Sequence, residues 1–418
     1  MVETPTNRAK AGRPRWWVAG LTLCLLVGTG VVAWVVVDDD PYVAPAPPST
    51  RSGPAPALAA AALADLERAV RSGDPEAARA LAPAGDDAAA ERLAGVVANA
   101  DAARVRDFSL RYVDAEGAYA DGAWHATADA TWRFAGFDPA PATAEVLVGL
   151  QDDGDRVAIT GVGGGDRVAP LWLSGPLQVR RTARTLVLVD GPAAEARSVA
   201  RHAAAAVPAV RRVLPRWQQG LVVEVPASVT ALDRVLDADP GTYDQIAAVT
   251  TSADGQLTPD APVHVFLNPE VYGGLRPTGA QVVMSHEATH VATGAFRSTM
   301  PLWILEGFAD YVALRDVDLP VARSASQIIA EVRRDGAPRA LPAAADFETR
   351  AAGLGATYEG AWLACRLLAQ DGGEAALVRF YGDVDRGRPV AAALRADLGL
   401  GVAAFTRQWR ALLQDLAG

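Results

Sequence analysis

Two short stretches decide the fold of this chain: His286-Glu287-Ala288-Thr289-His290 and Trp303-Ile304-Leu305-Glu306-Gly307-Phe308-Ala309-Asp310-Tyr311. On an α-helix, residues four apart share one face, so His286 and His290 can direct their imidazoles at a single cation. Glu306 can supply a third ligand. Three nitrogen or oxygen ligands with one position left for water are typical of catalytic zinc. The sequence therefore predicts Zn²⁺ bound by His286, His290 and Glu306.

The side chains beside these ligands predict the rest of the site. Glu287 directly follows His286, where its carboxylate can take a proton from a zinc-bound water and serve as the general base. Asp310 shares a helix face with Glu306 and is expected to accept a hydrogen bond from the non-ligating nitrogen of a zinc-bound histidine. Gly307 has no side chain, so we expect it to let the two helices approach closely.

Both stretches are predicted to be helical, with defined ends. Thr278 and Gln281 form a capping box at the start of the first helix, and Gly294 closes its C-terminus. The second helix is expected to start near Pro301, which is tolerated in a first turn, and to run through Leu314. The two histidines therefore fall in the middle of a helix, as a zinc site requires.

At these residues the chain resembles the gluzincin metallopeptidases, and within them the peptidase MA-like families. Their shared pattern is an HExxH helix followed by a helix with a Trp-x-x-Glu-Gly-x-Ala-x-Tyr-like sequence. The resemblance covers roughly Leu186 to the C-terminus, and its specific part runs from His286 to Tyr311. It implies a sheet lobe and a helical lobe, zinc at the same three ligands, and Glu287 as the general base.

Peptide hydrolysis also needs a donor for the negative charge that develops on the carbonyl oxygen. Tyr358, in Ala356-Thr357-Tyr358-Glu359-Gly360, resembles the tyrosine that opens a helix facing the zinc in gluzincins. We expect Tyr358 to fill this catalytic role. Arg315 and Tyr272 are the alternatives.

The expected activity is zinc-dependent hydrolysis of peptide bonds in a peptide or protein substrate. An endopeptidase is favoured, because no acidic motif for binding a terminal amine is recognisable. The alternative is a catalytically inactive, peptidase-like surface binding module whose accessory domain docks a partner. The presence of every catalytic donor favours the enzyme. A formal net charge of −10 argues against a nucleic-acid partner.

The N-terminal part predicts a membrane anchor. Residues 1–15 are basic and are expected to be cytoplasmic, and Trp16 to Val37 is an uncharged apolar stretch of about 33 Å as a helix. A linker rich in Pro and Ala follows at residues 38–56. The expected location is the cell membrane, with a single span and the catalytic domain outside the cytoplasm. A cleaved signal peptide is the alternative.

Residues 57–175 are expected to form a small α+β accessory domain, in which Ala-rich helices precede an antiparallel sheet. Its clearest strand is Trp124 to Phe134, where apolar and polar residues alternate without a break. The order of elements resembles a nuclear-transport-factor-like module. A regulatory or partner-docking role is the expectation for this domain.

Residues 176–418 are expected to form the metallopeptidase domain, so that the chain as a whole is α+β. Short apolar strands alternate with helices before the zinc helix, and helices follow it. Gluzincins keep a sheet at this position, and its edge strand pairs with the substrate backbone. Val263 to Leu267 is the predicted edge strand. His264 lies within it and is expected to be an ordinary strand residue, and a position facing the cleft is the alternative.

Overall fold

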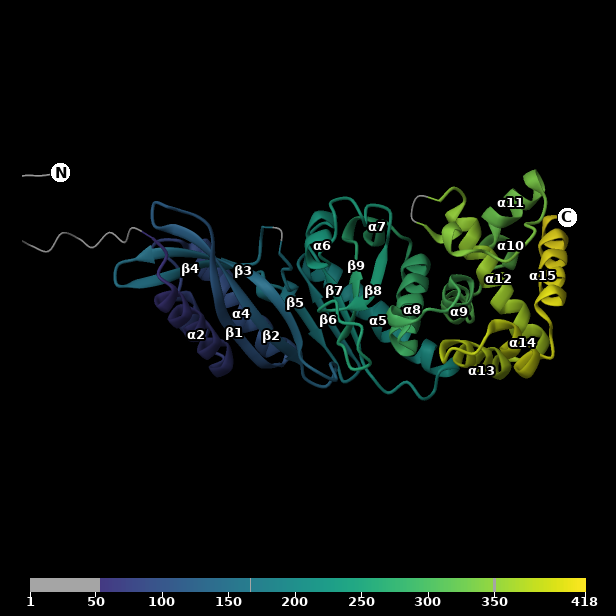
Figure 1. Ribbon diagram of the computed structural model, residues 1–418, viewed down its shortest axis with the longest axis horizontal. Coiled ribbons are helices and arrows are strands. Elements are labelled where there is room, and N and C mark those ends of the chain that lie inside the picture. The colour runs from purple at the N-terminus through teal and green to yellow at the C-terminus, as the bar shows by residue number, and fades with distance from the viewer. Residues whose placement is uncertain (1–52, 166, 349–350) are drawn as a thin grey trace, which may run out of the picture. The chain divides into compact units, whose positions relative to one another are not determined.

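A mixed α and β structure (Figure 1) is formed by the part of the chain that the computed structural model describes, which is residues 53–165, 167–348 and 351–418. The membrane anchor predicted at residues 16–37 lies outside this part. Every helix within the described part is too short or too polar to cross a bilayer. The predicted fold class is therefore corrected to α+β with no membrane-spanning helix among the described residues, and the predicted single-pass location in the cell membrane is not supported.

The first sheet is antiparallel and follows a group of helices, as the sequence predicts. The helices are α2 (Pro56–Ser72), α3 (Pro75–Arg79) and α4 (Asp87–Ala103). The strands pair in the order β1-β2-β3-β4 and are β1 (Val105–Ala120), β2 (Ala123–Phe134), β3 (Ala142–Asp153) and β4 (Arg156–Val162). The alternation predicted for β2 is confirmed, because every second side chain from Trp124 to Phe134 is buried.

The second sheet has five strands in the order β5-β6-β7-β9-β8. β6, β7 and β9 are parallel, whereas β5 and β8 run antiparallel at the two edges. Its elements, with the helices that precede or join the strands, are η1 (Leu171–Leu173), β5 (Gln178–Arg181), β6 (Thr185–Val189), α5 (Ala193–Val213), β7 (Leu221–Val225), α6 (Val229–Val235), β8 (Ala248–Ser252) and β9 (Val263–Leu267). The prediction that β9 is the edge strand is wrong, because β9 lies inside the sheet and β8 lies at its edge.

The rest of the chain is helical (Figure 1). Its elements are α7 (Pro269–Gly273), α8 (Pro277–Thr293), η2 (Ala295–Arg297), α9 (Leu302–Leu314), α10 (Val321–Ser324), α11 (Ser326–Asp335), η3 (Ala344–Phe347), α12 (Leu354–Gly372), α13 (Glu374–Asp385), α14 (Val390–Leu398) and α15 (Val402–Ala417). Helix α8 packs against α5, α9 and β8, and α9 packs against α12.

Both faces of the second sheet are covered, because successive side chains of β6 belong to different hydrophobic cores. Val187 and Val189 are buried in the core that contains α5, α8 and α9. Leu186 and Leu188 are buried in the core of the first sheet. The second sheet, which carries the edge strand, is thus packed between two hydrophobic cores. The domain boundary predicted near Gly175 stays a prediction.

A buried charged group also joins the two sheets. His264 on β9 is completely buried and donates hydrogen bonds to Glu224 on β7 (Nδ1 to Oε1, 2.7 Å) and to Asp138 after β2 (Nε2 to Oδ1, 3.0 Å). Burial lowers the pKa of His264, but the two carboxylates outweigh this effect and raise its pKa to about 10. His264 is therefore a charged link between the sheets and not the ordinary strand residue that the sequence predicts.

Candidate metal centre

Helix α8 carries both histidines of the motif. It starts at Pro277 after Arg276, and no side chain caps it, so the predicted capping box of Thr278 and Gln281 is wrong. The side chain of Gln281 instead donates a hydrogen bond to the backbone carbonyl of His202 at 3.2 Å. The predicted C-terminus is confirmed, because Gly294 adopts a left-handed backbone with φ 67° and ψ 33°.

Helix α9 supplies the third ligand and begins directly after Pro301, close to the predicted start. Its Gly307 permits a close approach, but to α12 and not to α8 as predicted. A Cβ atom at Gly307 would lie 2.3 Å from the carbonyl oxygen of Ala361 on α12. Because α12 also carries Tyr358, the glycine sets how near this tyrosine comes to the helix with Glu306.

The structure brings the three predicted ligands together. The Nε2 atoms of His286 and His290 lie 2.9 Å apart. The Oε2 atom of Glu306 lies 3.1 Å from Nε2 of His286 and 3.4 Å from Nε2 of His290. These three side chains form the one group of His, Cys, Asp or Glu residues in the described part of the chain that could hold a metal ion.

The spacing of these atoms fits a zinc ion. Ligands at about 2.0–2.2 Å from a tetrahedral Zn²⁺ lie roughly 3.3–3.5 Å from one another, and the triangle of donor atoms is only slightly tighter. The ligand types also match, since two imidazoles and one carboxylate are a common catalytic zinc set.

Asp310 lies where the sequence predicts it. Its Oδ1 accepts a hydrogen bond from Nδ1 of His286 at 2.8 Å, which leaves the lone pair of Nε2 free for a metal. Burial lowers the pKa of His286, but Asp310 and Glu306 outweigh this effect and raise the pKa well above its ordinary value, so a metal ion that binds at Nε2 must displace a proton from it. The Nδ1 atom of His290 is buried and has no hydrogen-bond partner within the described residues.

Glu287 is buried beside the ligands and is held by a residue that the sequence analysis missed. Thr250, on the edge strand β8, donates a hydrogen bond from Oγ1 to Oε2 of Glu287 at 2.6 Å. The carboxylate is thereby oriented from the sheet side. No motif marks Thr250, because the contact joins segments 37 residues apart.

Tyr358 lies beside the centre. Its ring centroid is 6.4 Å from that of His286 and 5.3 Å from that of Phe347. Burial, followed by the charges of the nearby carboxylates Glu306, Asp310 and Glu287, raises the pKa of Tyr358. The hydroxyl is therefore protonated and remains a hydrogen-bond donor at neutral pH.

The two alternatives to Tyr358 have other partners. The hydroxyl of Tyr272 donates to the carbonyl oxygen of Ala280 at 3.1 Å and contacts Nδ1 of His202 at 2.9 Å. Arg315 donates to Glu374 at 2.6 Å. Of the three candidates, Tyr358 is therefore the one whose contacts place it at the centre.

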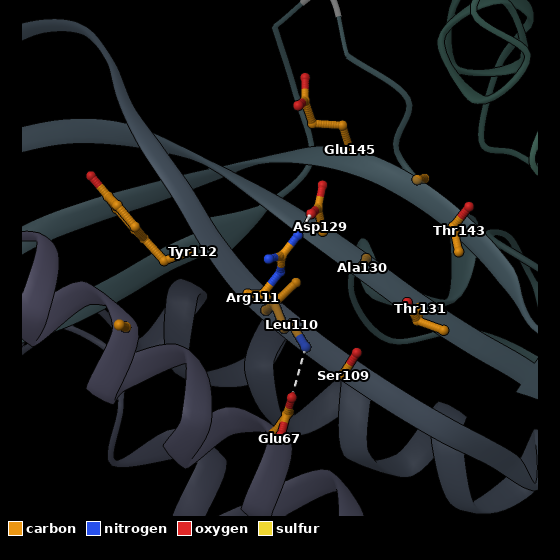
Figure 2. Close-up of a pocket in the computed structure, with 12 residues that line it drawn as sticks. Glu67, Ser109, Leu110, Arg111, Tyr112, Asp129, Ala130, Thr131, Thr143 and Glu145 are labelled. Carbon is orange, nitrogen blue, oxygen red and sulfur yellow. Dashed lines mark hydrogen bonds and ion pairs between the residues drawn. The ribbon is translucent and has the colours of Figure 1, made fainter.

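A separate pocket of about 770 Å³ lies on the first sheet, next to α2. Figure 2 shows its two internal contacts, from the backbone N–H of Leu110 to Glu67 and between Arg111 and Asp129. None of the predicted site residues lines this pocket. It is therefore not part of the metal centre.

The sequence matches no protein-family model and no curated protein. The resemblance to the gluzincins stays a prediction, which rests on the motif residues alone.

Proposed function

We propose that this protein is a zinc-dependent endopeptidase of the gluzincin type. The single observation that carries the proposal is the convergence of the Nε2 atoms of His286 and His290 and the Oε2 atom of Glu306 within 2.9 to 3.4 Å of one another. The carboxylate of Glu287 supports it, because it belongs to the same helix and is fixed by Thr250. The assignment to zinc rests on the ligand types and their spacing.

Bound zinc would supply a Lewis acid that lowers the pKa of water towards neutrality and polarises a carbonyl oxygen. In this proposal Glu287 accepts the proton of the attacking water and then delivers it to the leaving amine. Asp310 keeps the ring of His286 in the tautomer and orientation that ligation needs. The hydroxyl of Tyr358 donates a hydrogen bond to the oxygen on which negative charge develops.

The edge strand β8 offers a binding position for the substrate backbone. The carbonyl of Ala247 accepts from the N–H of Asn268 at 3.0 Å, and the N–H of Ala253 donates to Pro262 at 2.8 Å. Backbone groups of an antiparallel strand point alternately to its partner and away from it. The groups that point away from β9 are therefore those of Ala248, Thr250 and Ser252. We infer that a substrate adds there as an extended strand, next to Glu287.

The test uses the full chain supplied with Zn²⁺ and a library of peptides with both termini blocked. We expect internal cleavage that a chelator abolishes and that added Zn²⁺ restores. Glu287→Gln should keep the metal and lose roughly 10²–10⁴-fold in rate, as expected for loss of a general base. His286→Ala should lose both metal and activity.

The matched control is Glu76→Gln, the same change at a residue with a strongly exposed side chain on α3. It should cleave like the unaltered chain. Undiminished cleavage by Glu287→Gln would remove Glu287 from the role of base. Peptide binding without any chelator-sensitive cleavage would instead favour the alternative of an inactive binding module.

A further inference from the structure

A groove of about 650 Å³ lies between the first sheet and the edge strand β8. We call it the β3–β8 groove. The first sheet and the loop that follows it contribute Glu145 and Arg167, and the second sheet and its loops contribute Asp237, Tyr243, Val249 and Thr251. Thus the part of the chain with no role in the proposed chemistry forms one wall of a groove beside the substrate strand.

The direction of side chains along β8 links this groove to the metal centre. Thr250 points towards α8, where it bonds Glu287. Its neighbours Val249 and Thr251 therefore point to the other face of the sheet, and both line the groove. An extended peptide on the free edge of β8 has the same alternation. Every second side chain of that peptide would turn away from the metal centre and towards the groove.

The groove carries an excess of negative charge. Glu145, Asp237 and Asp254 contribute carboxylates, against one guanidinium from Arg167. That guanidinium already forms ion pairs with Glu145 and with Glu116. Asp237 is exposed, and within the described residues its carboxylate has no hydrogen-bond or ion-pair partner.

The uncharged part of the lining suits a long aliphatic side chain. Leu236, Val249 and the ring of Tyr243 lie in the same groove as the carboxylates. A lysine or arginine side chain places its methylene groups on apolar surface and keeps its charged end near polar groups. An aromatic ring also attracts a cation. The combination therefore matches a basic side chain better than an acidic or a small one.

We propose that the β3–β8 groove is a specificity subsite that takes a Lys or Arg side chain of an extended substrate close to the bond that is cleaved. The wall formed by Glu145 would then make the first sheet part of the substrate-binding surface. This inference rests on the proposed function, because the peptide backbone must lie along β8.

The experiment compares two labelled peptides that differ only in one residue, arginine in one and the uncharged citrulline in the other. Binding is measured by fluorescence anisotropy to the full-length Glu287→Gln chain with Zn²⁺, so that no turnover is needed. We expect a preference for arginine of about twofold to fivefold, since an exposed pair of opposite charges contributes a few-fold in affinity.

The groove variant adds Asp237→Asn and Glu145→Gln, and it should abolish this preference. The control variant adds Asp155→Asn and Glu76→Gln, the same loss of charge at exposed positions outside the groove, and it should retain the preference. Circular dichroism and thermal unfolding establish that both variants are folded. Equal affinity for the two peptides, or a preference that survives in the groove variant, would overturn the proposal.

The same peptides separate this inference from the proposed function. If the unaltered chain prefers the arginine peptide but cleaves neither, the proposed function fails and the groove remains supported as a binding site. If it cleaves both at equal rates and binds both equally, the groove proposal fails and the peptidase stands.

Discussion

The hydroxyl of Thr250 lies 2.6 Å from the carboxylate of Glu287 and 3.3 Å from the backbone carbonyl of the same residue. One side chain therefore fixes the edge of the second sheet to the helix that carries both histidines. This contact fixes the position of the carboxylate that would take a proton from water relative to the strand on which a peptide would lie. This coupling makes Thr250 a positioning residue that can be tested.

Thr250→Val keeps the shape of the side chain and removes its hydroxyl. We expect kcat to fall by about tenfold to a hundredfold, because a hydrogen bond to a charged group contributes roughly 1.5–3 kcal/mol. KM and zinc content should change little. Thr250→Ser, which keeps a hydroxyl, is the control and should retain most of the activity. Full kcat in the valine variant would show that Glu287 needs no orienting contact.

Asp310→Asn should weaken zinc binding by about 10- to 100-fold, because loss of the carboxylate that orients a ligating histidine typically has this effect. Competition with a chromophoric chelator measures the affinity directly. Asp318→Asn changes an exposed residue just beyond the same helix and should leave the affinity as it is. Equal zinc affinity in the two variants would contradict the role of Asp310.

Tyr358→Phe should lower kcat by roughly 10²–10³-fold with little change in KM, the usual cost of losing an oxyanion donor. Because the pKa of Tyr358 is raised, deprotonation of this hydroxyl should not limit the rate on the alkaline side of neutrality. Tyr112→Phe is the matched control, because the buried hydroxyl of Tyr112 has no partner in the described structure. An unchanged kcat in Tyr358→Phe would show that another group donates the hydrogen bond to the developing oxyanion.

Gly307→Ala should destabilise the protein by about 1–3 kcal/mol, the usual cost of overpacking a core. The added methyl group would meet the backbone of Ala361, which cannot move as a side chain can. Gly279→Ala, in the first turn of α8, meets nothing closer than 3.9 Å, and it should be stabilising by about 0.5–1 kcal/mol. Urea unfolding measures both changes. If both substitutions changed the free energy of unfolding in the same direction, the result would contradict this account.

The charged link at His264 predicts a loss of stability at alkaline pH. Its pKa is about 10 in the folded chain, against 6.5 for an ordinary histidine. Its contribution to the free energy of unfolding is thus fully present below about pH 6.5 and is lost as the pH rises through about 10. Asp138→Asn should reduce this dependence between pH 7 and 10, as measured by urea unfolding at a series of pH values. If the stability of that variant fell as steeply with rising pH, the charged link at His264 would be ruled out as the cause of the pH dependence.

Local spacing accounts for what the sequence could predict. His286 and His290 belong to one helix, and Glu306 follows in the next, so helical periodicity and a short connection are enough to bring them together. The burial of every second residue in β2 was equally predictable. Pro277 changed the start of α8, because a proline occupies its first position and leaves Thr278 inside the helix, where it cannot cap.

Contacts between distant segments account for what could not be predicted. The place of β9 inside the sheet depends on β8 pairing outside it, and both strands have only five residues. The two partners of His264 come from different elements, and Asp138 is 126 residues away in the chain. The role of Gly307 depends on α12, which no local pattern connects to α9.

The side chains of Leu186 and Leu188 give the second sheet a hydrophobic face that the first sheet covers. A truncated chain without the first sheet would expose this surface to solvent and would tend to aggregate. The two sheets should accordingly melt in a single cooperative transition.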